Sequence, residues 1–175
     1  MTQSIICKEN LKVLIDNHPF YKSINENLLK DLSTSFPATR SITNGGDNSE
    51  SAVKALQTYN DIESKDISLI NDWVISIVMN NKRYNHDLFI KDKWIAIYQN
   101  GDYTNPHTHI PSVYAFVYFI RCPKNSSPLV FTTSRRKIKA EEGKVVIFPG
   151  NLLHHVPKNK CDGRIILSGN LYYKV

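Results

Sequence analysis

Short apolar runs separated by turn residues fill the second half of the chain, and this pattern constrains the fold more than any other feature. Five runs rich in β-branched and aromatic residues occupy positions 94–98, 113–120, 128–131, 144–148 and 164–168. Glycine, proline, asparagine and aspartate residues lie between them and mark turns. Several short strands at this spacing are typical of a β-sandwich or a β-barrel.

The first half of the chain carries helical patterns instead. Leu11, Leu14 and Ile15 have the spacing of a helix face. The sequence Ser23-Ile-Asn-Glu26 fits a capping box, which would open a helix that continues through the leucines at 28, 29 and 32. We therefore expect helices early in the chain.

A longer amphipathic pattern follows. Residues 66–79 place Ile67, Ile70, Trp73 and Ile77 on one side of a helix, whereas the polar, glycine-containing stretch 43–51 predicts a loop. These patterns predict an α+β fold that is mainly β in its core. We expect one domain over residues 1–175, in which a mostly helical segment, 1–90, supports a β-core at 91–175 that carries the site.

Charge is distributed unevenly along the chain. The net charge is +6, but residues 91–175 hold 13 lysines and arginines against five aspartates and glutamates. A basic half can attract nucleic acid or an acidic small molecule. The basic run 135–139 alternates around Ile138, however, which favours a strand with exposed lysines over a nucleic-acid-binding arm. Nucleic acid is therefore an open but not a favoured partner.

The chain has no features of a membrane or secreted protein. No apolar run approaches the roughly 18 residues that a membrane span needs, and the first residues have neither a basic nor a long apolar segment of a signal peptide. The three cysteines, Cys7, Cys122 and Cys161, are odd in number and widely spaced, which suggests reduced thiols. We expect a cytoplasmic protein without a membrane partner.

Four of the six histidines form two close groups within the predicted β-core. His107 and His109 are two residues apart, so on an extended chain their side chains share a face roughly 6.6 Å apart along the backbone. Of the adjacent pair His154 and His155, only one can point inward from a strand. Three imidazoles that converge from two segments can hold one metal ion and leave open positions for oxygen and substrate.

An arginine completes this predicted site. If the turn after His154 is a hairpin symmetric about Asn159, Arg164 lies opposite His154, and directly opposed residues share a face. Arg164 would then enter the same cavity, while His155 points away. A guanidinium in such a place is suited to holding a carboxylate through two parallel hydrogen bonds.

The segment from Trp94 to Asn170 resembles the superfamily of 2-oxoglutarate- and Fe(II)-dependent oxygenases, and most closely the small oxygenases predicted in marine bacteria and their phages. The matching motifs, in order, are Trp94-x-x-x-Tyr98-x-x-Gly101-Asp102, His107-Thr-His109, Val117-Tyr-Phe119, Pro128-Leu-Val-Phe131, Glu142-Gly-Lys-Val-Val-Ile-Phe-Pro149, His154-x-Val-Pro157 and Arg164 to Asn170. They cover under half of the chain.

The resemblance implies a fold, two cofactors and a set of roles. The fold would be a double-stranded β-helix, or jelly roll. The metal would be Fe(II), bound by His107, His109 and His154, and Arg164 would bind the far carboxylate of the co-substrate 2-oxoglutarate, with Tyr98 and Tyr118 lining its pocket. The implied activity is hydroxylation of a substrate that the sequence does not identify, in the cytoplasm of a host cell if a phage encodes the protein.

The sequence departs from the superfamily pattern at two positions. His109 stands where a carboxylate is usual, although the relatives that the chain most resembles also carry His-x-His. Asp102 is the alternative third ligand; we favour His109 because Asp102 precedes the predicted turn. The second departure is Ile166, which stands where relatives often have a serine and which cannot donate a hydrogen bond to the co-substrate.

Two other functions fit the same residues. One is a cupin-like three-histidine oxygenase that does not use 2-oxoglutarate, in which Arg164 would hold a carboxylate of the substrate itself. The other is a jelly-roll binding module without catalytic activity.

Overall fold

The computed structural model describes residues 11–35, 52–58, 61–81 and 86–174. Within these ranges the chain forms two helices and eleven strands. In chain order these are β1 (Leu14–Asn17), α1 (Tyr21–Thr34), β2 (Val53–Lys54), β3 (Leu56–Gln57), α2 (Lys65–Asn81), β4 (Leu88–Tyr98), β5 (Tyr103–His107), β6 (Tyr114–Arg121), β7 (Leu129–Phe131), β8 (Arg136–Ile138), β9 (Lys144–Pro149), β10 (His154–Val156) and β11 (Arg164–Tyr173).

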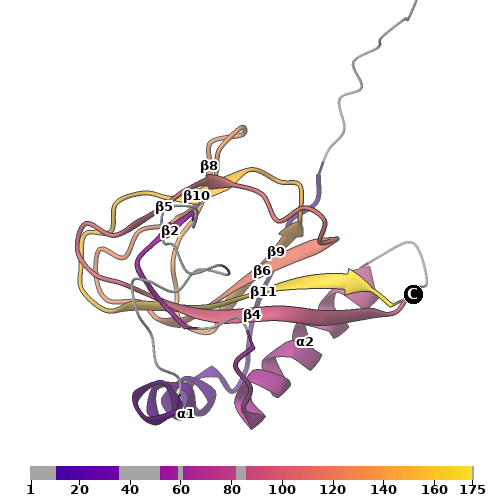
Figure 1. Ribbon diagram of the computed structural model, residues 1–175, viewed down its shortest axis with the longest axis horizontal. Helices are drawn as coiled ribbons and strands as arrows, with labels where there is room; N and C mark the ends of the chain where they lie inside the picture. Colours follow the sequence, from indigo (N-terminus) through magenta and orange to yellow (C-terminus); the bar gives the residue numbers. More distant parts are fainter. Residues whose placement is uncertain (1–10, 36–51, 59–60, 82–85, 175) are drawn as a thin grey trace, which may run out of the picture.

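The strands form two antiparallel sheets. The larger, here called the major sheet, has the order β1-β9-β6-β11-β4-β3, and the smaller, the minor sheet, has the order β2-β5-β10-β7-β8. In Figure 1 the two sheets face each other, and both helices lie on the outer side of the major sheet. Helix α1 packs on β6, and α2 packs on β4 and β9. This is the predicted jelly roll with supporting helices.

Alternation along the major sheet builds two hydrophobic clusters, one on each of its faces. On β6, Phe116 and Tyr118 belong to the cluster beneath the helices, whereas Val117 and Phe119 belong to the cluster between the sheets. Strand β11 alternates in the same way. Because successive side chains of a strand point to opposite faces, a single long strand contributes to both clusters. The cavity described below lies beside the cluster between the sheets.

Helix α2 confirms the predicted amphipathic helix. Ile67 and Ile70 are fully buried, as expected, and Val74 continues their line toward β4 and β9. Trp73 and Ile77 are partly buried against the same cluster. All four predicted residues therefore face the core, but only two of them are fully buried.

Helix α1 is also present, but the predicted capping box is wrong. The helix starts at Tyr21, and its N-cap residue, Phe20, makes no capping side-chain hydrogen bond. Ser23 lies inside the first turn, where its hydroxyl donates to the Phe20 carbonyl, and Glu26 forms an ion pair with Lys30. The serine therefore lies three residues too late to cap the helix.

Another expectation for the first ninety residues needs correction. The spacing of Leu11, Leu14 and Ile15 indicated a helix, but residues 14–17 form β1, which pairs with β9 at the edge of the major sheet. Leu11 and Ile15 are about half exposed, so they form no buried helix face. Strands β2 and β3 also belong to this segment, so it contains short strands as well as the two helices. The loop predicted at 43–51 lies outside the described residues.

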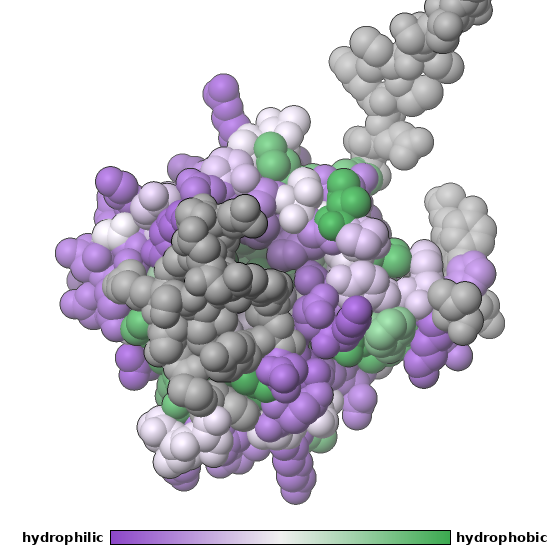
Figure 2. All heavy atoms as spheres, in the orientation of Figure 1, coloured by the Kyte–Doolittle hydropathy of each residue, from purple (hydrophilic) through white to green (hydrophobic). Residues whose placement is uncertain are grey.

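The basic run has the exposed lysines that its alternation around Ile138 predicted. The basic run forms β8, with Lys137 and Lys139 exposed on either side of the partly buried Ile138. Hydrophilic residues dominate the face of the molecule seen in Figure 2, and hydrophobic residues there occur in small groups. No helix in the described part of the chain is long and apolar enough to cross a membrane.

Candidate metal centre

The three predicted histidines meet at one end of the space between the sheets. His107 is the last residue of β5 and His154 the first of β10, and the two are directly paired in the minor sheet. His109 lies two residues beyond the end of β5, where its backbone N–H donates to the Gly150 carbonyl at 2.6 Å. The nitrogen ligand atoms of the three rings all lie within 4.8 Å of one another.

The spacing of these nitrogens fits one metal ion. The Nε2 atoms of His109 and His154 are 3.3 Å apart. Two ligands at right angles around an ion, each about 2.1 Å away, would lie about 3.0 Å apart, so small ring movements would bring both nitrogens to binding distance. Three histidines on one side of an ion leave its other positions open, as in a facial triad.

Backbone carbonyls fix the orientation and tautomer of two of the rings. The Nδ1 atom of His107 lies 2.9 Å from the Asn105 carbonyl, and that of His154 lies 2.9 Å from the Leu152 carbonyl. A carbonyl oxygen only accepts, so Nδ1 carries the proton in each ring and Nε2 presents its lone pair. This is the usual outer-shell arrangement of histidines that bind a metal.

The surroundings keep the imidazoles neutral. Burial, reinforced by the neighbouring histidines, lowers the pKa of His109 and of His154 to about 3. Burial also lowers the pKa of His107. Aromatic rings cause part of this burial: Phe148 lies edge-on to His154 at 4.6 Å and Trp94 lies 6.0 Å from His109. At neutral pH all three rings are therefore uncharged, which is the form that binds metals.

Asp102, the alternative third ligand, has a different position. It lies in the turn between β4 and β5, and its Oδ2 accepts a hydrogen bond from the backbone N–H of Gln99 at 2.8 Å. Among the described residues, only the three histidines form a group of possible ligands. The observed role of this carboxylate is to cap the turn, which favours His109 as the third ligand.

A cavity extends from the histidines toward Arg164. It has a volume of about 390 Å³, counting the open space at its mouth. Most of its exposed wall surface is apolar, although about half of the lining side chains carry a polar group. The lining residues are Val53, Trp94, Tyr98, Thr104, His107, His109, Val117, Leu129, His154, Val156, Arg164, Ile166 and Ser168.

Arg164 is a buried cation with no acidic partner among the described residues. Its side chain has no exposed surface, and its Nε donates to the Ser127 carbonyl at 3.1 Å. The two terminal nitrogens are buried without a hydrogen-bond partner. The guanidinium stacks 4.5 Å from the ring centre of Tyr98. Burial lowers the pKa of this arginine, and an anion in the cavity would supply the missing partner.

Arg164 and His154 share the cavity for a different reason from the one the sequence suggested. The predicted hairpin around Asn159 is wrong, because β10 pairs with β5 and β7, whereas β11 pairs with β4 and β6. The two residues lie on opposite sheets and meet across the space between them. His155 does point away, as expected, and its Nδ1 lies 2.8 Å from the hydroxyl of Thr132.

The two predicted tyrosines have different positions. Tyr98 lines the cavity, and its hydroxyl lies 2.7 Å from that of Thr104. Tyr118 does not line it: the expectation is wrong, because position 118 of β6 faces the helices, where its hydroxyl donates to Asn25 at 2.8 Å. Phe119 faces the space between the two sheets, so strand alternation would have placed Tyr118 on the opposite face, away from the cavity.

Sequence reasoning missed three polar or aromatic residues of the cavity. Ser168 follows Arg164 and Ile166 on the same face of β11, so strand parity alone would have identified it. Trp94 lies on the same face of β4 as Tyr98, so parity would have identified it as well. Thr104 gave no such signal, since it belongs to no motif that predicts a ligand.

Comparisons with solved structures show the fold. A viral collagen prolyl hydroxylase from Paramecium bursaria Chlorella virus-1, solved with 2-oxoglutarate, superposes with a TM-score of 0.72 at 16% identity, covering 93% of this chain and 96% of that one. A prolyl-4-hydroxylase from Pseudomonas putida gives 0.70 at 11% identity, covering 93% and 92%. A Trichoplax adhaerens prolyl hydroxylase, solved with a peptide fragment, gives 0.66 at 12%, covering 90% and 82%.

These likenesses extend over nearly the whole chain. No protein-family model and no curated protein matches the sequence. The fold is therefore that of the 2-oxoglutarate- and Fe(II)-dependent oxygenases, at identities that establish the architecture alone.

Proposed function

We propose that the protein is a non-haem dioxygenase that uses Fe(II) and 2-oxoglutarate to hydroxylate a substrate not yet identified. One observation carries the proposal: a cluster of three neutral histidines and a buried guanidinium without a counterion line the same cavity. The similar structures include three proteins named as prolyl hydroxylases, one of them solved with 2-oxoglutarate, which supports hydroxylation as the reaction.

His107, His109 and His154 would hold the iron. When bound, it would supply the redox centre that couples decarboxylation of 2-oxoglutarate by oxygen, giving succinate and CO2, to hydroxylation of the substrate. The protein holds the rings in place. The carbonyls of Asn105 and Leu152 orient two of them by accepting hydrogen bonds from Nδ1 of His107 and His154. With no carboxylate among these ligands, the charge of the ion needs a compensating anion.

Arg164 would bind the far carboxylate of 2-oxoglutarate. Its terminal nitrogens can donate two parallel hydrogen bonds to one carboxylate, and the nearby hydroxyls of Tyr98 and Thr104 can add further polar contacts. Ile166 contributes an apolar wall in place of another donor. The apolar lining of Val117, Leu129 and Ile166 excludes water around the reacting groups.

Anaerobic titration tests this proposal directly. We expect the protein with Fe(II) to develop a visible charge-transfer absorption band when 2-oxoglutarate is added, and to form succinate once air is admitted. Freshly reconstituted protein that shows neither the band nor protection by 2-oxoglutarate in thermal unfolding would contradict it.

A three-histidine oxygenase that does not use 2-oxoglutarate is the second candidate, and the absence of a carboxylate from the histidine cluster favours it. In that enzyme Arg164 would hold a carboxylate of the substrate. Oxygen consumption without any requirement for 2-oxoglutarate, and without succinate as a product, would distinguish it from the first.

Asn159 gives a prediction about how Arg164 is positioned. This buried residue accepts from the Ser127 backbone N–H at 3.0 Å through Oδ1, and its Nδ2 donates to the Cys161 carbonyl at 2.6 Å. It thereby fixes the segment whose carbonyl accepts from Arg164 Nε. We expect Asn159→Ala to raise the KM for 2-oxoglutarate by about tenfold, the lower range for an outer-shell partner, with a smaller change in kcat.

Asn25 is the matched control. It is also buried, donating to the Ile120 carbonyl at 2.7 Å and accepting from Tyr118, but it lies on the helix side of the major sheet. Asn25→Ala should lower the thermal midpoint comparably and leave the KM for 2-oxoglutarate unchanged. Equal KM values for both variants would show that Asn159 is only structural.

A further inference from the structure

The metal-facing side of the minor sheet ends in an arginine. Strand register places His107, His154, Phe131 and Arg136 in one row across β5, β10, β7 and β8. Directly opposed residues share a face, so Arg136 lies on the same face as the histidines. Neighbouring strands are about 4.8 Å apart, which puts its backbone roughly 10 Å from that of His154.

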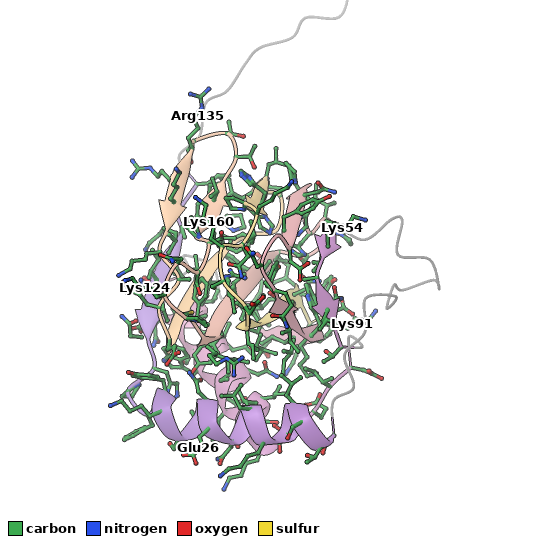
Figure 3. All side chains as sticks on the ribbon, turned by 90° about the vertical axis from the view of Figure 1, so that its left-hand side faces the viewer. Glu26, Lys54, Lys91, Lys124, Arg135 and Lys160 are labelled. Carbon is green, nitrogen blue, oxygen red and sulfur yellow. The ribbon has the colours of Figure 1, made fainter. Side chains whose placement is uncertain are left out.

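The turn of the β7–β8 hairpin, residues 132–135, extends this basic feature. Arg135 has a left-handed backbone with φ of 57°, a conformation that is uncommon for residues other than glycine. Its side chain lies at the tip of the hairpin and points away from the body of the molecule (Figure 3). Both Arg135 and Arg136 are exposed, and no ion pair within the described part of the chain involves either.

No negative charge offsets these arginines within their sheet. The five strands of the minor sheet contain no aspartate or glutamate. Lys137, next along β8, is opposite Val130, and Val130 is opposite His155, so this lysine faces the outer side. On the face of the minor sheet that carries His107 and His154, the cationic groups therefore lie at the β8 edge, on Arg136 and at the hairpin tip.

An apolar groove runs beside Arg136. It lies between the segment that leads into β1 and the β7–β8 hairpin, and its walls include Leu11, Val13 and Leu152. Strands β1 and β8 are each an edge strand of their sheet among the described residues, so the groove lies at a seam between the two sheets. A free edge can accept an extended peptide through backbone hydrogen bonds, and the aliphatic wall can pack against alternate side chains of that peptide.

We infer that the substrate docks as an extended acidic polypeptide segment in this groove, with its carboxylates held by Arg135 and Arg136. The inference rests on the proposed function, and charge complementarity indicates the occupant. Arg136 lines the groove and Arg135 lies at the tip of the adjoining hairpin, and neither forms an ion pair among the described residues. Nucleic acid fits less well, because single strands bind by stacking bases on aromatic rings, and the one aromatic residue of the groove, Phe131, is buried.

Peptide binding to the full-length chain tests the inference. The probe is a fluorescein-labelled decapeptide of alternating glutamate and leucine, and its partner probe has glutamine in place of glutamate. Fluorescence anisotropy should show tighter binding of the glutamate peptide, weakening with added salt. The double variant R135A/R136A should bind it about tenfold more weakly, as expected for the loss of two charge-assisted contacts at an interface.

A charge-matched variant gives the control. K22A/K65A removes two exposed cations from the helix side and should bind the glutamate peptide as the unmodified protein does. Equal weakening by both double variants, or no preference for glutamate over glutamine, would overturn the inference. So would stronger Arg135- and Arg136-dependent binding of a single-stranded oligonucleotide of equal charge, which would point to nucleic acid instead.

The same experiment separates this inference from the proposed function. The hairpin arginines lie outside the cavity that Arg164 lines, so R135A/R136A should keep the charge-transfer band with Fe(II) and 2-oxoglutarate. Selective peptide binding without that band would leave the docking surface in place and contradict the dioxygenase. The charge-transfer band without selective peptide binding would support the dioxygenase and contradict the docking surface.

Discussion

Replacing His154 with alanine is expected to abolish Fe(II) binding and all turnover of 2-oxoglutarate. The ring lies at the centre of the cluster, with its Nε2 3.3 Å from that of His109 and its backbone paired with His107. Loss of one ligand of three should exceed the roughly 10- to 100-fold effect of losing an outer-shell partner. Iron content after anaerobic reconstitution and succinate formation measure the result.

The adjacent histidine offers a matched control. His155 has the same chemistry one position further along β10, but its ring contacts Thr132 on the other face of the sheet. His155→Ala should keep iron content and succinate formation close to those of the unmodified protein. If both variants lose iron equally, the metal does not bind at the cluster formed by positions 107, 109 and 154.

Replacing Arg164 with methionine is expected to separate stability from function. A buried cation with a single hydrogen bond and no counterion destabilises the fold, and an apolar side chain of similar length often restores or improves stability. The thermal midpoint of the metal-free protein should therefore stay the same or rise. Affinity for 2-oxoglutarate should fall by at least about thirtyfold, since losing one partner of a buried charge pair costs on the order of 2–5 kcal/mol.

Lys93 provides the comparison for this variant. It is a second buried cation of the major sheet, but it forms an ion pair with Glu63 and does not line the cavity. Lys93→Met should leave the affinity for 2-oxoglutarate unchanged. Isothermal titration of the Fe(II) protein measures affinity, and calorimetry measures stability. Unchanged affinity in Arg164→Met would remove the assigned role of the guanidinium.

Much of the fold could be predicted because local pattern and tertiary role agree. The runs at 94–98, 144–148 and 164–168 are strands whose side chains alternate between the two hydrophobic clusters, so both faces are buried. Helix α2 has an apolar stripe long enough to be unambiguous. Residues 14–17 could not be assigned in this way. Four residues at a sheet edge fit helix and strand periods equally, and only their pairing with β9 decides between them.

Strand pairing around the site could not be predicted from the local sequence either. The types and order of His107, His109, His154 and Arg164 suggested a shared cavity, and the structure brings all four to its lining. The hairpin that was meant to bring 154 and 164 together does not exist, because sequence neighbours in a jelly roll often cross to the opposite sheet. Contacts such as that of Asn159 with Ser127 depend on loops whose course no local pattern encodes.

The apolar cluster beneath the helices determines whether folding depends on metal binding at the proposed site. That cluster lies on the far side of the major sheet from the three imidazoles, so the polypeptide can reach its native state without the ion. Zinc fingers behave oppositely, since metal and folding are inseparable in them. If the proposed iron binds the three imidazoles, we expect it to enter and leave a scaffold that is already folded.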